Sequence, residues 1–312
     1  MENALKFGVT FTIAQQVTGI LDFAPFAEEL GYDSVWCNDH LVWRRPLFDC
    51  LTVLAGYAAR TTRVQIGSAV LILPLRNPAL LAKAAATLDI LSGGRLILGL
   101  GAGGEYPKEF EACGIAVKER GRRTDEAIEV MKRLWSGESV SYEGRFYRFA
   151  EISMAPRPLQ RPHPPLFIGG RADPSLRRVA RFGDAFFPYF LSPDSYAARL
   201  AQVHEYMVGL GRAPAALEAA HMLHICAGST REQARETAAA SIVESYSLGL
   251  DAQAMLDKFC AYGTPADCAA RIGQFIAAGA RHFVFEPLCS PATVMRQYEM
   301  IAREVLPLVR GS

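Results

Sequence analysis

A chain of 312 residues, half of them hydrophobic, is long enough to bury a sizeable core. Its 33 lysines and arginines nearly balance its 32 aspartates and glutamates, so the net charge of +1 gives no electrostatic reason to expect a nucleic acid or an anionic membrane as a partner. We therefore expect a small-molecule ligand bound at a local site.

The seven cysteines indicate reduced thiols, because they are scattered, odd in number and contain no C-x-x-C pair. The first residues, MENALKFGVTF, lack the basic stretch, the apolar stretch and the cleavage site of a secretory leader. No run approaches the roughly 18 apolar residues that a membrane-spanning helix needs. These features predict a cytoplasmic protein with no membrane segment.

Short β-rich runs alternate with longer helical patterns from the start of the chain. Strands are expected over residues 5–11, 34–37, 63–73 and 95–104, and helices over 19–33, 48–62 and 78–94. The run RVQIGSAVLIL at 63–73 is continuously hydrophobic, which is typical of a strand covered on both faces. Pro78 and the pair Gly93–Gly94 mark the start and the end of the third helix.

The alternation continues after an interruption at 139–165, which is expected to be an irregular insertion: a β-hairpin turning at Glu143–Gly144 and then a crossing loop. Further strands are expected over 165–170, 184–190, 217–228 and 281–288, and further helices near 174–183, 194–210, 230–258, 265–279 and 294–309. About eight strands, each followed by a helix, predict an α/β fold, a (β/α)₈ TIM barrel forming one domain over 1–312. A doubly wound open sheet with extra elements is the alternative.

Polar residues follow several of the predicted strands at the point where each strand ends. They are Asn38, Asp39 and His40, the turn from Gly101 to Glu105, the turn from Gly169 to Arg171, and Glu286. In a barrel the carboxyl ends of the strands converge on one rim, where catalytic groups lie. The four strand ends therefore predict one shared pocket, with ordinary solvent-facing strand caps as the alternative for any single one.

Two of these strand ends are rich in glycine. The stretch LGLGAGG at 98–104 matches the dinucleotide pattern G-x-G-x-x-G, but no acidic residue closes a second strand about twenty residues later, so the signal is weak. In FIGGRADPSL the turn Gly169–Gly170 precedes a helix expected near Pro174, and Arg171 adds positive charge. Free backbone N–H groups and a helix N-terminus favour an anion there. A plain tight turn with a solvated basic helix is the alternative.

No metal or hydrolase motif accompanies these turns. His221 and His224 are three residues apart in a predicted strand and so point to opposite faces, and the chain lacks an H-E-x-x-H pattern and a G-x-S-x-G elbow. We expect no metal site, and the sequence supplies no ligand cluster for a metal-dependent barrel hydrolase. His163, His204 and His282 are expected to be surface or structural residues.

Five segments together resemble the bacterial luciferase-like superfamily, in order and over nearly the whole chain: residues 26–41, 63–104, 109–135, 165–187 and 262–285. The resemblance implies a (β/α)₈ barrel that binds FMN or the deazaflavin coenzyme F420 at its C-terminal rim. Such an enzyme is an oxidoreductase acting on a small organic molecule.

The resemblance also implies roles for individual residues. GSAVLILP matches the family strand with a non-proline cis peptide, here at Ala69–Val70, which supports the cofactor ring. The cofactor site further includes the strand-end residues Asp39, Gly101, Gly103, Gly169, Gly170 and Arg171, of which the last three are near the phosphate. The pair Asp39–His40 looks like the pair of deazaflavin-type members, in which the histidine lies near the reactive face.

One departure concerns Glu105. In the deazaflavin sugar-phosphate dehydrogenases a glutamate directly closes the glycine turn after the fourth strand, whereas GAGGEYPKEF has an additional glycine before Glu105. The departure weakens the case for Glu105 as a proton donor and argues against sugar-phosphate oxidation in particular.

Hydride transfer between F420 and a small organic substrate is the leading interpretation, with His40 as the acid or base, held against Asp39 or a backbone group. The alternatives are an FMN-dependent monooxygenase that uses O₂, with or without a separate flavin reductase, and a non-catalytic flavin-binding protein. A role for His40 in hydrogen bonding alone is also open. The alanine-rich helix at 78–92 leaves a homodimer open as well. Candidate aromatic walls of the pocket are Phe11, Trp43, Tyr106 and Phe187.

Overall fold

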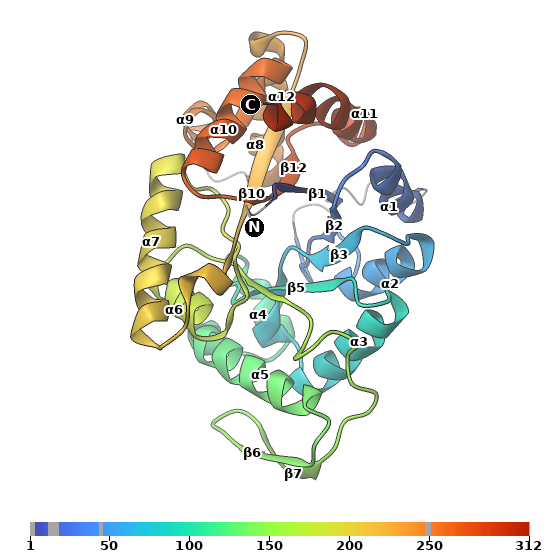
Figure 1. Cartoon of the computed structure of the whole chain (residues 1–312), viewed down its shortest axis with the longest axis vertical. Coiled ribbons are helices and arrows are strands. Elements are labelled where there is room, and N and C mark those ends of the chain that lie inside the picture. The colour runs from blue at the N-terminus through green and yellow to red at the C-terminus, as the bar shows by residue number, and fades with distance from the viewer. Residues whose placement is uncertain (1–3, 12–18, 44–45, 247–250, 312) are drawn as a thin grey trace.

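Eight parallel strands close into a barrel in the computed structural model, which describes residues 4–11, 19–43, 46–246 and 251–311 (Figure 1). In barrel order they are β1 (Lys6–Phe11), β2 (Ser34–Cys37), β3 (Gln65–Ser68), β5 (Leu96–Gly101), β8 (Leu166–Ile168), β9 (Ala185–Phe186), β10 (Glu218–Ala227) and β12 (His282–Pro287). Pairing of β9 with β10 and of β12 with β1 closes the ring. The predicted (β/α)₈ barrel is confirmed, and the open sheet is wrong.

Two short strands accompany the barrel. β4 (Leu71–Ile72) continues beside β5 after the peptide bond between Ala69 and Val70, which is cis as predicted. β11 (Ala261–Gly263) pairs with the outer part of β10 and was not predicted.

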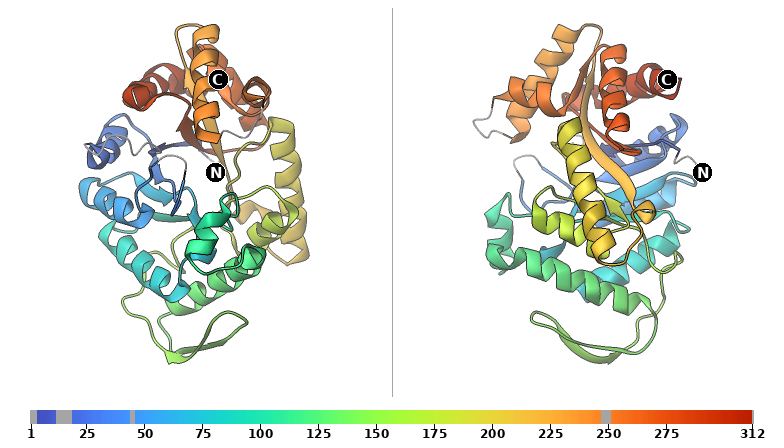
Figure 2. Two further views of the ribbon diagram at one scale, coloured as in Figure 1. Left: turned by 180° about the vertical axis from the view of Figure 1, so that it is seen from behind. Right: turned by 60° about the vertical axis from the view of Figure 1, so that its left-hand side comes forward.

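Helices surround the barrel on its outside (Figure 2). They are α1 (Ile20–Glu29), α2 (Cys50–Arg60), α3 (Pro78–Leu91), α4 (Pro107–Ala112), α5 (Arg120–Trp135), α6 (Asp173–Phe182), α7 (Pro193–Gly209), α8 (Arg231–Tyr246), α9 (Ala252–Phe259), α10 (Pro265–Ala277), α11 (Val294–Met300) and α12 (Leu306–Arg310). Local signals fix several starts: the Asn77 side chain accepts from the first amides of α3, and Thr264 forms a capping box with Asp267 on α10.

The expectation of one helix over 230–258 is wrong. The described residues form two helices, α8 and α9, and residues 247–250 between them lie outside the described part of the chain. Asp251 begins α9 as a new helix, because its carboxylate accepts hydrogen bonds from the amides of Gln253 and Ala254.

The predicted insertion is present. β6 (Val140–Glu143) and β7 (Arg148–Ile152) form the antiparallel hairpin that projects from the barrel in Figure 1, and residues 153–165 then cross back irregularly to β8. The hydroxyl of Tyr142 donates to Glu129 of α5 at 3.2 Å, which ties the hairpin to the outer helices.

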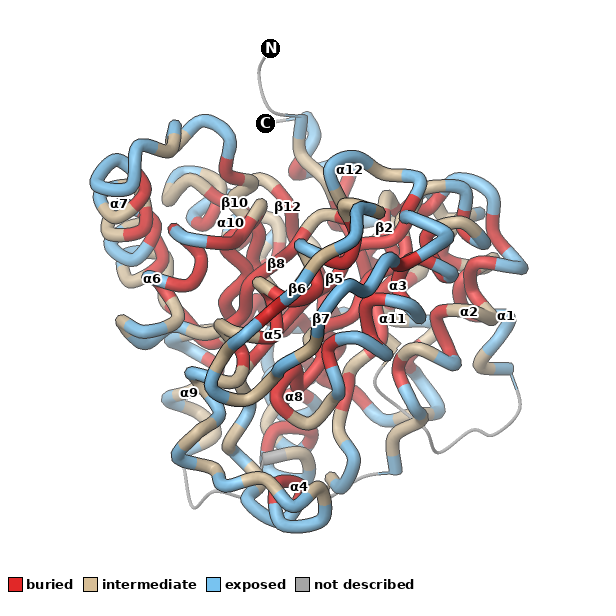
Figure 3. The backbone as a smooth tube through the Cα atoms, turned by 90° about the horizontal axis from the view of Figure 1, so that it is seen from below, coloured by how far each residue is buried: buried red, intermediate tan, exposed pale blue. Residues whose placement is uncertain are grey.

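The strands of the barrel consist largely of buried residues, as the red parts of the backbone in Figure 3 show. Trp36, Phe167 and Phe187 pack against one another there, with ring centroids 5.0–5.8 Å apart. A Cβ atom at Gly67 would lie 2.3 Å from the Trp36 ring, so the tryptophan requires glycine at that position. Below it, buried His282 is hydrogen-bonded to Ser34 and Glu218, the structural role that was expected. A ligand site is thereby confined to the rim.

Candidate cofactor and active site

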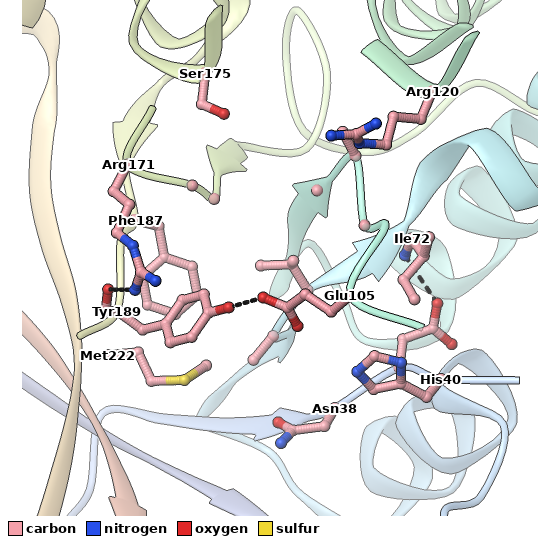
Figure 4. A pocket seen from close by; sticks show the side chains of 18 of the residues that line it. Asn38, His40, Ile72, Glu105, Arg120, Arg171, Ser175, Phe187, Tyr189 and Met222 are labelled. Carbon is pink, nitrogen blue, oxygen red and sulfur yellow. Dashed lines mark hydrogen bonds between the residues drawn. The ribbon is translucent and has the colours of Figure 1, made fainter. Parts of the chain in front are cut away.

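A cavity of about 560 Å³ lies at the carboxyl ends of the strands (Figure 4). Its size is within the roughly 300–1,000 Å³ of small-molecule sites. All nine residues that the sequence analysis assigned to the site line it: Asp39, His40, Ala69, Val70, Gly101, Gly103, Gly169, Gly170 and Arg171. Asn38, Glu105 and Glu286 line it too, so the four polar strand ends meet in one pocket as expected. The chemical role of each residue stays a prediction.

His40 is held by Glu109, a residue that the sequence analysis did not single out. Nδ1 of His40 lies 2.9 Å from Oε1 of Glu109, and Oε2 of the same carboxylate accepts the main-chain N–H of Leu41 at 2.7 Å. The Glu109 side chain is 1% exposed. Because a carboxylate only accepts hydrogen bonds, Nδ1 of His40 carries a proton, and Nε2 is the ring nitrogen left for a ligand in the cavity.

Asp39 does not hold His40, contrary to one of the two possibilities expected. Its carboxylate pairs with Arg76 at 2.7 Å and accepts the main-chain N–H of Ile72 at 3.0 Å. Arg76 also reaches Asp49, the N-cap of α2, at 3.2 Å. Burial lowers the pKa of Arg76, but the two carboxylates outweigh burial and raise it. Asp39 therefore anchors β4 to the loop after β2.

Glycines bring the backbone of neighbouring strands close to the Ala69–Val70 segment. A Cβ atom would lie 2.6 Å from Val70 Cγ2 if placed at Gly101, and 3.4 Å from Val70 if placed at Gly169. At Gly103 it would lie 2.6 Å from Ile72 Cγ2, and the backbone φ there is +60°. The absence of side chains leaves the face formed by Ala69 and Val70 open to the cavity, which fits the support of a flat ring.

One end of the cavity is built to hold an anion. Gly170, with φ of +104°, leads into α6, and the N-terminal turn of this ten-residue helix faces the pocket through Pro174 and Ser175. The cations lining this end are Lys118, Arg120, Arg171 and Arg178. Arg178 is itself engaged by Asp125 at 2.6 Å and by the carbonyl of Gly121 at 3.1 Å. The glycine turn, the helix start and the cations fit a phosphate group.

The other end of the cavity is lined by apolar side chains together with His40 and Glu286. The Trp43 ring stacks on His40, with centroids 4.1 Å apart, and Phe187 and Met222 line the opposite side. Glu286, 6% exposed, accepts a hydrogen bond from Thr10 Oγ1 at 2.6 Å. The other two expected wall residues do not line the cavity, because Tyr106 contacts Trp43 from behind the lining and Phe11 packs on Phe23.

Glu105 faces Tyr189 across the cavity. Its carboxylate accepts a hydrogen bond from the Tyr189 hydroxyl, and the guanidinium of Arg171 lies 5.3 Å from the centre of the Tyr189 ring (Figure 4). Burial and the nearby carboxylate raise the pKa of Tyr189. The phenol is therefore protonated at neutral pH and able to donate.

Metal-binding clusters and membrane-spanning helices are both absent from the described part of the chain. No group of three or more His, Cys, Asp or Glu side chains there is arranged to hold a metal ion. No helix among the described residues is both long and apolar enough to cross a membrane.

The sequence is similar to the sequences of oxidoreductases from other organisms. An F420-dependent glucose-6-phosphate dehydrogenase of Kineococcus radiotolerans is 39% identical over 191 residues, which cover 58% of this chain and 56% of the relative, so the matched part spans only about half of that protein. A 5,10-methylenetetrahydromethanopterin reductase of Methanolobus tindarius is 25% identical over 337 residues, which cover 97% of this chain and all of the reductase.

A solved structure resembles the whole chain. The monooxygenase RslO1 of Streptomyces bottropensis superposes with a TM-score of 0.84 at 26% identity, covering 97% of this chain and 99% of its own. The sequence pattern of the luciferase-like monooxygenase family matches residues 5–282, which is most of the chain. The chain therefore belongs to the luciferase-like monooxygenase family.

Proposed function

We propose that the protein transfers a hydride between coenzyme F420 and a small organic substrate, with His40 as the acid or base. The relatives support the coarser statement, that the chain is an oxidoreductase of the luciferase-like type whose cofactor is F420 or FMN. The observation that carries the finer proposal is the His40–Glu109 pair, because it orients an imidazole toward the same cavity as the glycine cradle. A cytoplasmic location is part of the proposal.

The residues of the anion-binding end would hold the phosphate of the cofactor. Main-chain N–H groups after Gly169 and Gly170 and the start of α6 would face the phosphate, and Arg171 would neutralise its charge. Lys118 and Arg120 extend the positive charge beyond the turn, which suits the acidic tail that F420 carries and FMN lacks. Ala69 and Val70 supply the apolar face for the ring.

The chemistry of the site follows from the orientation of His40. Bound F420 supplies the carbon that donates or accepts the hydride. His40, whose Nδ1–H is fixed by Glu109, exchanges a proton with the substrate oxygen through Nε2. Trp43 covers one face of the imidazole, and Phe187 covers the far side of the cavity, so both exclude water from the reacting atoms.

A second candidate is an FMN-dependent monooxygenase. The 26% identity with RslO1 over nearly the whole chain favours it, and it would use a separate flavin reductase as a partner. In such an enzyme a dry cavity matters more than a titrating side chain, so His40 would be less important.

Parallel titrations of the protein with F420 and with FMN test the proposal. We expect F420 to bind more tightly, and we expect oxidised F420 to lose its absorbance when a panel of small alcohols is added. His40→Ala should keep the affinity for F420 and lose turnover, whereas His204→Ala, on α7 outside the cavity, should keep both. Tighter binding of FMN would support the second candidate. Turnover unaffected by His40→Ala would remove the proposed acid or base, and binding without any turnover would favour a flavin-binding protein.

A further inference from the structure

Three loops at the solvent end of the cavity are joined by a chain of contacts. Glu105 belongs to the loop between β5 and α4, Arg171 to the loop between β8 and α6, and Tyr189 to the loop between β9 and α7. Tyr189 is the middle member, because its hydroxyl donates to Glu105 and its ring and carbonyl oxygen contact Arg171. Figure 4 shows the hydroxyl and the carboxylate meeting over the cavity, with His40 and Asn38 on one side and Arg120 and Ser175 on the other.

Tyr189 is fixed more firmly than its two partners. Its backbone forms a parallel bridge with Met222 of β10, and its ring packs on Phe190, with centroids 5.2 Å apart. The Nη1 atom of Arg171 donates to the Tyr189 carbonyl at 3.3 Å. Glu105 and Arg171 are exposed, whereas Tyr189 is half-buried. Tyr189 therefore holds a fixed position, and two exposed, charged side chains contact it.

We propose that Tyr189 is a positioning residue for cofactor binding, whose contact with Glu105 is a latch that closes the cavity over the bound cofactor. The inference rests on the proposed function, because a latch is useful only if a cofactor extends from the anion-binding end to His40. The hydroxyl and the carboxylate stand between these two ends, so a ligand that occupies both ends passes the latch when it enters and when it leaves.

A latch of this kind has a distinct kinetic signature. Entry and exit both need the open state, so the fraction of time that the latch is open multiplies the association and the dissociation rate constants equally. Removing the Tyr189 hydroxyl raises both constants and leaves their ratio, the dissociation constant Kd, unchanged. A residue that merely contacts the bound cofactor would change the dissociation rate and Kd together.

Stopped-flow binding of F420 to the full chain, or of FMN if that is the cofactor that binds, tests the latch. Tyr189→Phe keeps the ring under Arg171, and Glu105→Ala removes the same hydrogen bond from the other loop. For both variants we expect association and dissociation to be faster by roughly 10- to 100-fold, the value of one hydrogen bond to a charged group. Glu105→Gln keeps an acceptor for the hydroxyl and should lie between these variants and the unaltered protein.

Tyr142→Phe is the matched control, because it removes the hydrogen bond from a tyrosine to a glutamate in the remote hairpin. Its rate constants should equal those of the unaltered protein. Rate constants within twofold of the unaltered protein in both Tyr189→Phe and Glu105→Ala would overturn the latch, and so would a rise in dissociation that is matched by a rise in Kd. Failure of the unaltered protein to bind either cofactor would overturn the proposed function and the latch together.

Discussion

Replacing Glu109 by glutamine tests whether the carboxylate sets the chemistry of His40. The two oxygens of Glu109 serve different donors, since Oε1 meets Nδ1 of His40 at 2.9 Å and Oε2 meets the amide of Leu41 at 2.7 Å. Glutamine has the same shape but one oxygen and one NH₂ group. In the variant, one of these two donors therefore faces another donor instead of an acceptor.

The cost can be estimated from this geometry. A hydrogen bond to a charged group contributes about 1.5–3 kcal/mol. Since only one donor keeps its acceptor, we expect Glu109→Gln to lower kcat/KM by roughly 10- to 100-fold. Glu109 does not line the cavity, so the affinity for the cofactor should change little.

The assay combines kinetics with the tautomer of His40, which long-range ¹⁵N–¹H NMR correlations report without any substrate. In the unaltered protein we expect the proton on Nδ1, and in Glu109→Gln a shift toward the tautomer with the proton on Nε2. Glu111→Gln is the matched control, because Glu111 lies on the same helix, is exposed and pairs with Lys108 at the surface. An unchanged tautomer together with unchanged kcat/KM in Glu109→Gln would refute the reasoning.

Two further predictions concern stability. Gly99→Ala would place a Cβ atom 1.8 Å from the carbonyl oxygen of Ser68, so it should lower the free energy of unfolding by about 3 kcal/mol or more. Gly273→Ala meets open space on α10 and should raise the free energy of unfolding by up to about 1 kcal/mol. Thermal unfolding of the two variants checks both values. Burial raises the pKa of Glu218, but hydrogen bonds from His282 and Lys6 outweigh burial and lower it from 4.5 to about 2. The carboxylate therefore contributes stability that is complete above about pH 4.5 and is lost as the pH falls toward 2, on the order of 2 kcal/mol. Urea unfolding at pH 5 and pH 3 should show a smaller decline for Glu218→Gln, and equal declines would contradict the assignment.

The barrel could be predicted because its signals are local. The alternation of strands and helices, the proline that starts α3 and the glycines that end it are all readable in short windows of sequence. β11 gave no such signal, because three residues, Ala261–Gly263, are too few to show a period of two. The break between α8 and α9 was missed because the segment reads as continuously helical, and Asp251 is a cap only once a new helix begins there.

Site residues that directly follow a strand could be predicted from the sequence. Site residues that reach the pocket only through the folding of a distant segment could not. His40, Gly169 and Arg171 are adjacent to strand ends, so the position of the strand places them in the pocket. Glu109 lies on a short helix next to exposed charged residues, and 69 residues separate it from His40. Charged residues in such a helix are most often solvated, and only the closed barrel makes this one a buried partner.

The aromatic side chains inside the barrel have a consequence for the order of events at the rim. Trp36 and Phe167 fill the barrel beneath the rim, and Phe187 lines the cavity next to them, so a ligand enters the cavity from the rim and not through the barrel. Two molecules bound one above the other in such a cavity share that entrance. The inner one would then bind first and leave last, and turnover with two such ligands would follow a compulsory order.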